Sequence, residues 1–205
     1  MLSEKPIKNE KFQLGVGPVD NNAKRIPWSK HYQLKLDDFQ GKSNDVTKHE
    51  AQMAISIQPE YSVRFHGNKI KTYEITNMRV RANFQPTHAW INPSFWPEEN
   101  TESALKFYQG SFDLAEELAR KAQINAENKL YGRRFVCRGK SEQERKESSL
   151  VEAKSKIFEV IKPSLIEFAK EQLKYEKELN SPEKFQQNYP KYQKRFDDLR
   201  TEIKT

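Results

Sequence analysis

A change of hydrophobic period divides this chain of 205 residues into two unlike halves. Apolar residues alternate with polar ones within residues 53–84, as at Tyr61, Val63 and Phe65, and a period of two is typical of half-buried strands. From Thr101 onward apolar residues recur every three or four positions, which is typical of helices. Strands followed by helices predict an α+β fold, with an N-terminal antiparallel β-sheet and long C-terminal α-helices.

The expected boundaries follow from breaks in these periods. Residues 1–25 show no period and are predicted to form a flexible N-terminal arm, which leaves 26–205 as one domain. Its strands are expected within about 26–92, with a hairpin turn at 66–68, and its helices within about 101–203.

Turn residues and prolines divide the helical half further. The predicted helices cover 101–130, about 148–179 and 182–203, and a charged loop is expected at 132–147. Asn100 or Thr101 is the expected N-cap of the first helix, and Gly132 its stop. Pro163 is expected to kink or restart the second helix and Pro190 to interrupt the third, because proline lacks the N–H that a helix interior needs.

Composition excludes several classes of protein. Hydrophobic residues make up 35% of the chain, but 12 Phe, 8 Tyr and 3 Trp predict a thin, aromatic-rich core. No apolar run approaches the roughly 20 residues of a transmembrane helix. The single cysteine, Cys137, excludes an internal disulfide and a zinc site built from cysteines. The first residues lack the apolar stretch of a signal peptide, so a cytoplasmic location is expected, or a secreted one if a signal has been removed.

Five segments carry a family resemblance. They are LKLDDFQG from Leu34, FQPTHAW from Phe84, FYQGSFDLAE from Phe107, YEKELNS from Tyr175, and Gln193 with Phe196. In order and spacing they resemble L-x-W-x-D-F-x-G, F-D-P-x-x-S-W, H-E-Q-x-H-F-D-I-x-E, Y-D-x-E-T-x-H and Q-x-x-W. These motifs belong to a bacterial family of predicted secreted zinc-dependent proteases, catalogued as a domain of unknown function. The resemblance implies a zincin-like fold.

The chain departs from this family where the chemistry would be. In H-E-x-x-H the two histidines bind zinc from one helical face and the glutamate acts as general base. The matching positions here are Phe107, Tyr108 and Ser111, and Ser181 stands where the resemblance suggests a third histidine ligand. Phenylalanine has no lone pair to donate, tyrosine with a free pKa near 10 is a poor base, and serine is a weak zinc ligand. We therefore expect no metal and no cofactor, and a catalytically inactive relative retained as a binding or structural scaffold.

A relocated active site is one alternative. His88 and Trp90 in the expected loop, with Asp113 and Glu116 on the helix, are candidates for a pocket, and Ser111 or Cys137 for a nucleophile. The arginines near Cys137 would favour its thiolate. The string His49-Glu50 begins like a metal motif, but Met53 stands at its fifth position and we interpret it as chance.

A basic loop supports the other alternative. Arg133, Arg134, Arg138 and Lys140 could contact phosphate, and the net charge of +7 permits a nucleic-acid or acidic-surface partner. Acids and bases alternate along most of the chain, however, which is more typical of a solvated helix surface than of a nucleic-acid footprint. The partner is not identified by the sequence, and a protein partner is also compatible with it.

Overall fold

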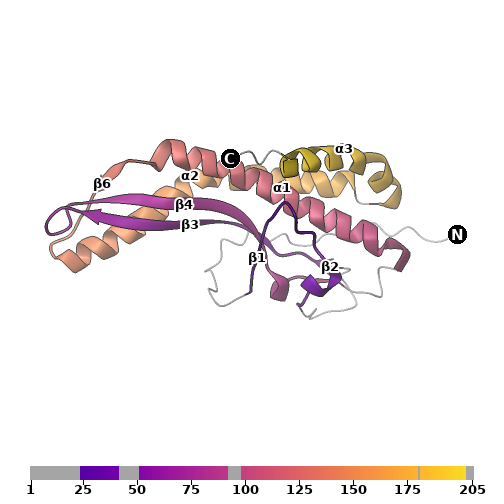
Figure 1. Ribbon diagram of the computed structural model, residues 1–205, viewed down its shortest axis with the longest axis horizontal. Coiled ribbons are helices and arrows are strands. Elements are labelled where there is room, and N and C mark those ends of the chain that lie inside the picture. Colours follow the sequence, from indigo (N-terminus) through magenta and orange to yellow (C-terminus); the bar gives the residue numbers. More distant parts are fainter. Residues whose placement is uncertain (1–23, 42–50, 92–97, 180, 202–205) are drawn as a thin grey trace. The chain divides into compact units, whose positions relative to one another are not determined.

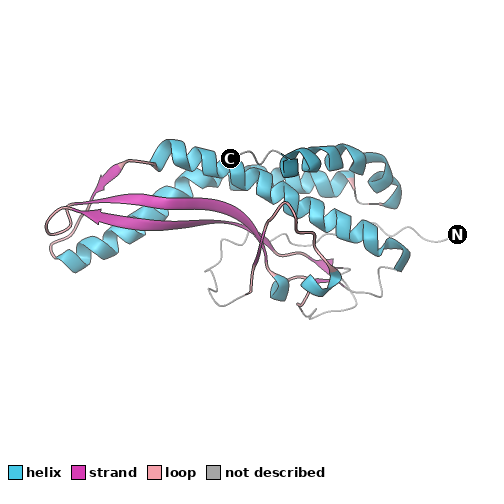
Figure 2. Cartoon of the chain, viewed as in Figure 1, coloured by secondary structure: helices cyan, strands magenta, loops and turns pink. Residues whose placement is uncertain are grey.

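The computed structural model describes residues 24–41, 51–91, 98–179 and 181–201. It confirms the α+β fold class, because antiparallel strands in the N-terminal half are followed by three helices (Figures 1 and 2). The helices are α1 (Glu98–Leu130), α2 (Glu142–Glu178) and α3 (Pro182–Thr201). Two 3₁₀ turns, η1 (Leu36–Asp38) and η2 (Pro86–His88), lie in the connections. Residues 1–23 of the expected arm lie outside the described residues.

Strand β4 (Thr72–Phe84) is central to the main sheet. It pairs with β3 (Ile55–His66) on one side, and on the other with β1 (Ile26–Pro27) near its end and β6 (Arg134–Val136) near its start. The β1 and β6 pairings are antiparallel. Strands β2 (Ala51–Gln52) and β5 (Trp90–Ile91) form a separate antiparallel pair.

The chain divides into two compact units. Unit 1 comprises residues 1–56, 82–117 and 168–205, and unit 2 comprises 57–81 and 118–167. Strands β3 and β4 and helices α1 and α2 each contribute one stretch to each unit, whereas α3 lies entirely in unit 1.

Unit 1 has the aromatic core expected from composition. Its buried side chains include Phe84, Phe112, Tyr175, Tyr192 and Phe196. These rings come from β4 and all three helices, so packing between distant segments, rather than any local run, forms this core.

Unit 2 buries aliphatic side chains around Tyr73. Ile75 and Val80 from β4 are buried with Leu118 from α1 and Ile157 from α2. The edge of β4 is capped by Gln123 of α1, whose carboxamide accepts from the Val80 N–H at 2.6 Å and donates to the Met78 carbonyl at 3.0 Å. These bonds satisfy strand groups that would otherwise stay unpaired.

Several boundary predictions were wrong. Residues 132–147 are not one loop, because β6 pairs with the open edge of β4 and α2 already begins at Glu142. Helix α1 begins at Glu98, so Asn100 and Thr101 lie inside it and do not cap it. It ends at Leu130, and Gly132 adopts a positive φ of 69° just beyond, as expected.

Neither proline interrupts its helix. Helix α2 passes Pro163 without restarting, and α3 is continuous through Pro190. Both prolines are exposed, so each ring lies on the outer face of its helix, where water can satisfy the carbonyl that loses its partner. Within the described residues, no helix is long and apolar enough to cross a membrane.

Candidate functional site

Helix α1 places Phe107, the first of the positions that we compared with H-E-x-x-H, in an aromatic cluster of unit 1. The half-buried Phe107 ring stacks on Tyr175 of α2 with 5.2 Å between centroids. The Tyr175 hydroxyl donates to the Phe107 carbonyl at 3.0 Å, and burial raises the pKa of Tyr175 well above its usual value. Phe107, which matches a zinc-ligand position of the resembled family, is thus packed against a second aromatic ring.

The general-base position, Tyr108, is 8% exposed and packs against Phe39. Phe39 in turn contacts Phe84 at 5.2 Å between centroids, and Phe84 contacts Phe112. These rings come from three of the segments that carry the family resemblance. The structure therefore brings those segments together around α1, although they lie far apart in the sequence.

Ser111 is completely buried one turn further along α1. Its hydroxyl oxygen accepts a hydrogen bond at 3.0 Å from the side-chain amide of Gln172 on α2, a buried residue that the sequence analysis did not single out. His88 is exposed and its ring contacts the Thr87 hydroxyl, and the Cys137 thiol is buried in unit 2.

Ser181 caps helix α3. Its hydroxyl accepts from the Lys184 N–H at 3.3 Å, and its carbonyl accepts from the Phe185 N–H at 2.8 Å. A serine at this place satisfies helix N–H groups that have no partner within the helix. Ser181 therefore acts as the N-cap of α3.

Asp113 anchors the segment before η1. One oxygen of this buried carboxylate accepts from Trp28 Nε1 at 2.7 Å and from Gln109 Nε2 at 2.9 Å, and it also forms an ion pair with Arg200 of α3. Burial raises the pKa of Asp113, while Trp28 and Arg200 act in the lowering direction. Gln109 also accepts from the Leu34 N–H at 2.7 Å. This arrangement ties the two ends of the described chain to α1.

The four residues predicted for a pocket have separate partners. Glu116 is buried and accepts from the Ala82 N–H at 3.2 Å, which places it on the edge of β4 rather than beside His88. Trp90 is buried, whereas His88 is exposed. Trp28 and Arg200, which contact Asp113, had no sequence signal because each lies at least 85 residues from it.

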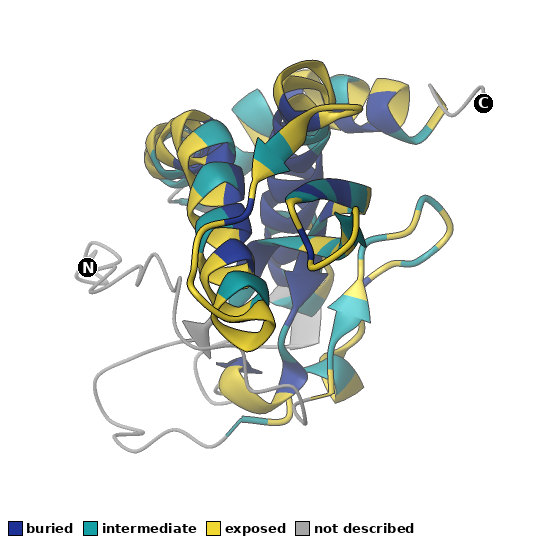
Figure 3. Ribbon diagram, turned by 90° about the vertical axis from the view of Figure 1, so that its left-hand side faces the viewer, coloured by how far each residue is buried: buried dark blue, intermediate teal, exposed yellow. Residues whose placement is uncertain are grey.

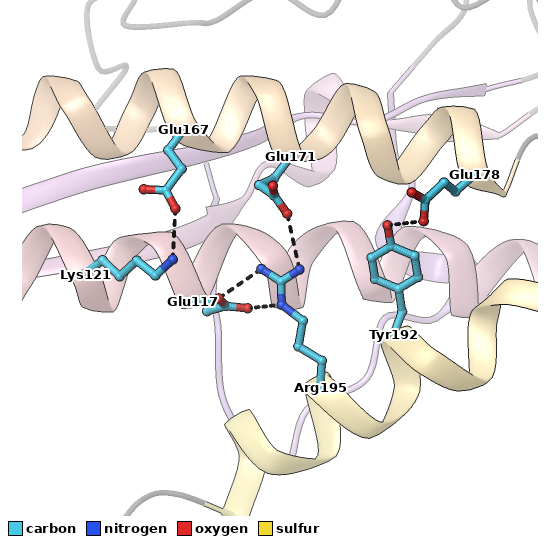
Figure 4. A network of polar contacts seen from close by, with 7 residues as sticks. All are labelled: Glu117, Lys121, Glu167, Glu171, Glu178, Tyr192 and Arg195. Carbon is cyan, nitrogen blue, oxygen red and sulfur yellow. Dashed lines mark hydrogen bonds and ion pairs between the residues drawn. The ribbon is translucent and has the colours of Figure 1, made fainter.

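A second polar network joins the helices of unit 1. Arg195 of α3 donates to both oxygens of Glu117 on α1, at 2.6 and 2.9 Å, and to Glu171 on α2 at 3.3 Å (Figure 4). Tyr192 donates to Glu178 at 2.8 Å. Because these buried and half-buried side chains come from three helices, the network holds α3 against α1 and α2.

The basic segment lies in unit 2. Arg133, Arg134, Arg138 and Lys140 are all exposed, whereas Cys137 between them is buried and its N–H donates to the Lys71 carbonyl at 2.9 Å. The Cys137 thiol, a candidate nucleophile from the sequence, is therefore buried although exposed arginines flank it. The four cations remain available to an anionic partner.

No group of three or more His, Cys, Asp or Glu side chains in the described part of the chain is arranged to hold a metal ion. His49 and Glu50 lie outside the described residues. Comparisons with known protein families, curated proteins and solved structures find no match for this chain. Its function therefore has to be argued from the contacts themselves.

Proposed function

We propose that this chain is a catalytically inactive relative of the zinc-dependent proteases it resembles, retained as a binding or structural scaffold. The observation that carries the proposal is what fills the motif positions on α1. Phe107 and Tyr108 pack in an aromatic cluster, and Ser111 is held by Gln172. A polar metal pocket without its metal would leave buried groups unpaired, so filling it with packed rings lowers the free energy of the folded state.

The chemistry of these groups supports the same conclusion. The ring of Phe107 offers no donor atom, and the raised pKa of Tyr175 keeps its hydroxyl neutral, as a hydrogen-bond donor to the Phe107 carbonyl. Ser181, at the expected third ligand position, serves α3 as an N-cap. One buried acceptor, Gln172 Oε1, lacks a partner among the described residues, but a carboxamide oxygen suits calcium or magnesium better than zinc.

Metal content of the purified chain tests the proposal. After incubation with zinc and dialysis, elemental analysis is expected to find far less than one zinc per chain, and generic peptide substrates are expected to stay intact. About one zinc ion per chain, or peptide hydrolysis that a chelator abolishes, would overturn the proposal.

Restoring the H-E-x-x-H residues tests whether these positions derive from a zinc site. The variant Phe107→His, Tyr108→Glu, Ser111→His, Ser181→His is expected to retain about one zinc per chain, because it restores the ligands of a tetrahedral site. The matched control, Ile124→His, Asn125→Glu, Asn128→His, builds H-E-x-x-H on exposed positions of α1 and is expected to lose its zinc on dialysis. Circular dichroism checks that each variant is folded. A folded restored variant that retains no more zinc than the control would contradict the relationship.

A further inference from the structure

The positive charge of the chain resides in unit 2. Its two segments, 57–81 and 118–167, contain 17 Lys and Arg against 9 Glu, a net charge of +8. The whole chain carries +7, so the residues of unit 1 sum to −1. Such segregation concentrates any electrostatic attraction for a polyanion on unit 2.

Many of the acids of unit 2 already have partners. Glu142 pairs with Lys146, Glu152 with Lys156, and Glu167 with Lys121 (Figure 4). Glu74 contacts His66 at 3.2 Å, and the Glu144 carboxylate accepts from the backbone N–H of Lys140. These acids are therefore already engaged by partners within unit 2.

Six exposed cations gather at one end of unit 2, which we call the basic end: Lys69, Lys71, Arg133, Arg134, Arg138 and Lys140. The β6 ladder places Arg134 opposite Glu74 and Val136 opposite Thr72, so the arginine segment runs beside the β3–β4 turn (Figure 1). Within the part of the chain that the structure describes, none of the six side chains forms an ion pair. Their charge remains available to a partner.

Exposed aliphatic side chains accompany these cations. On β6 the Phe135 ring contacts Tyr73, which is buried, so alternation turns Arg134 and Val136 to the outer face, where Val136 is 66% exposed. The Ser148 hydroxyl donates to the Arg138 carbonyl and so holds the start of α2 against the basic segment. Leu150 and Val151, 48% and 72% exposed, follow within one turn. Figure 3 shows how exposed and buried residues alternate along the helices.

We propose that the basic end is a docking site for an anionic membrane surface. Lysines and arginines attract acidic headgroups, and aliphatic side chains beside them bury apolar area at the acyl boundary. Single-stranded nucleic acid would use the cations too, but its bases stack on aromatic rings, and Val136, Leu150 and Val151 offer none. Tyr131, 79% exposed before Arg133, suits the membrane interface, but a base can also stack on its ring, so oligonucleotide binding has to be measured beside vesicle binding. This inference rests on unit 2 alone and does not depend on the site in unit 1.

Vesicle sedimentation of the full chain tests the charge requirement. The protein is expected to sediment with phosphatidylcholine vesicles containing about a third phosphatidylglycerol, and not with pure phosphatidylcholine. Neutralising four cations, Lys71→Gln, Arg133→Gln, Arg134→Gln, Arg138→Gln, is expected to lower partitioning about a hundredfold or more at low salt. The matched control removes four exposed lysines of unit 1, Lys170→Gln, Lys174→Gln, Lys177→Gln, Lys194→Gln, and is expected to bind nearly as well as the wild type.

A second variant separates lipid from nucleic acid. Val136→Ser with Val151→Ser leaves every charge in place and is expected to weaken vesicle binding several-fold, while any weak binding to a single-stranded oligonucleotide stays unchanged. The proposal is overturned if both four-cation variants bind vesicles equally, or if the valine variant binds them like the wild type. It is also overturned if the oligonucleotide displaces the vesicles and is bound more tightly.

Discussion

At the scale of single residues, Gly110 determines how closely α1 approaches Tyr175. A Cβ atom there would overlap the Tyr175 hydroxyl and lie 2.9 Å from a ring carbon of Phe196. Gly110→Ala is expected to lower the free energy of unfolding by about 1–3 kcal/mol despite the better helix propensity of alanine. Chemical denaturation measures the change. In a Tyr175→Phe background, which removes the overlapping oxygen, the same substitution is expected to cost less; an equal cost in both backgrounds would contradict the contact.

For the positions compared with H-E-x-x-H, the sequence predicted what the side chains can do chemically, but it did not predict their partners. The ring of Phe107 has no lone pair for a metal in any fold, and a tyrosine hydroxyl such as that of Tyr108 is a poor general base. The partner of Ser111 was not predictable, since Gln172 lies 61 residues away and nothing local indicates which face of α2 it occupies. The same holds for Asp113, whose partners come from both ends of the described chain.

At the scale of elements, substitution of Ser181 tests whether this residue caps α3. Ser181→Ala is expected to lower the free energy of unfolding by about 1 kcal/mol because the Lys184 N–H loses its acceptor, whereas Ser181→Asp is expected to keep the cap. Thermal and urea denaturation measure both. Ser155→Ala, at an exposed interior position of α2, is the matched control and is expected to change stability little. Equal stability of wild type and Ser181→Ala would refute a capping role.

Element boundaries were predicted well where the hydrophobic period was strong and poorly where it was absent. The segment 142–147 is charged and shows no apolar face, yet it is helical. Ser141 caps it by accepting from the Glu144 N–H at 3.1 Å, and Arg145 donates to the Gly139 carbonyl. Strand β6 likewise forms because the start of β4 offers an edge, and that edge is a tertiary feature.

At the scale of the whole molecule, half-buried tyrosines with raised pKa values predict that alkaline pH lowers stability. Burial, followed by donation to Asp38, raises the pKa of Tyr32 from 10.0 to about 12, and burial raises the pKa of Tyr189 to about 12. Between pH 10 and 12 the unfolded chain loses these protons while the folded chain keeps them, so the free energy of unfolding must fall as pH rises. Denaturation at a series of pH values measures this loss.

The double variant Tyr32→Phe, Tyr189→Phe is expected to lose less stability over this pH range than the wild type. Tyr131→Phe, at a side chain that is 79% exposed, is the matched control and is expected to follow the wild type. If the double variant and the wild type lose stability in parallel, these two hydroxyls do not account for the alkaline effect.

The sequence by itself determined the order of strands and helices, the aromatic character of the core and the presence of Phe107, Tyr108 and Ser111 where a zinc motif would have histidine and glutamate. These properties are local, because period and functional groups are read directly along the chain. Tertiary structure decided which segments meet: Ser111 with Gln172, Asp113 with Trp28 and Arg200, and the arginine segment with the β3–β4 turn. Such contacts depend on burial and pairing between residues far apart in the chain, which no local pattern encodes.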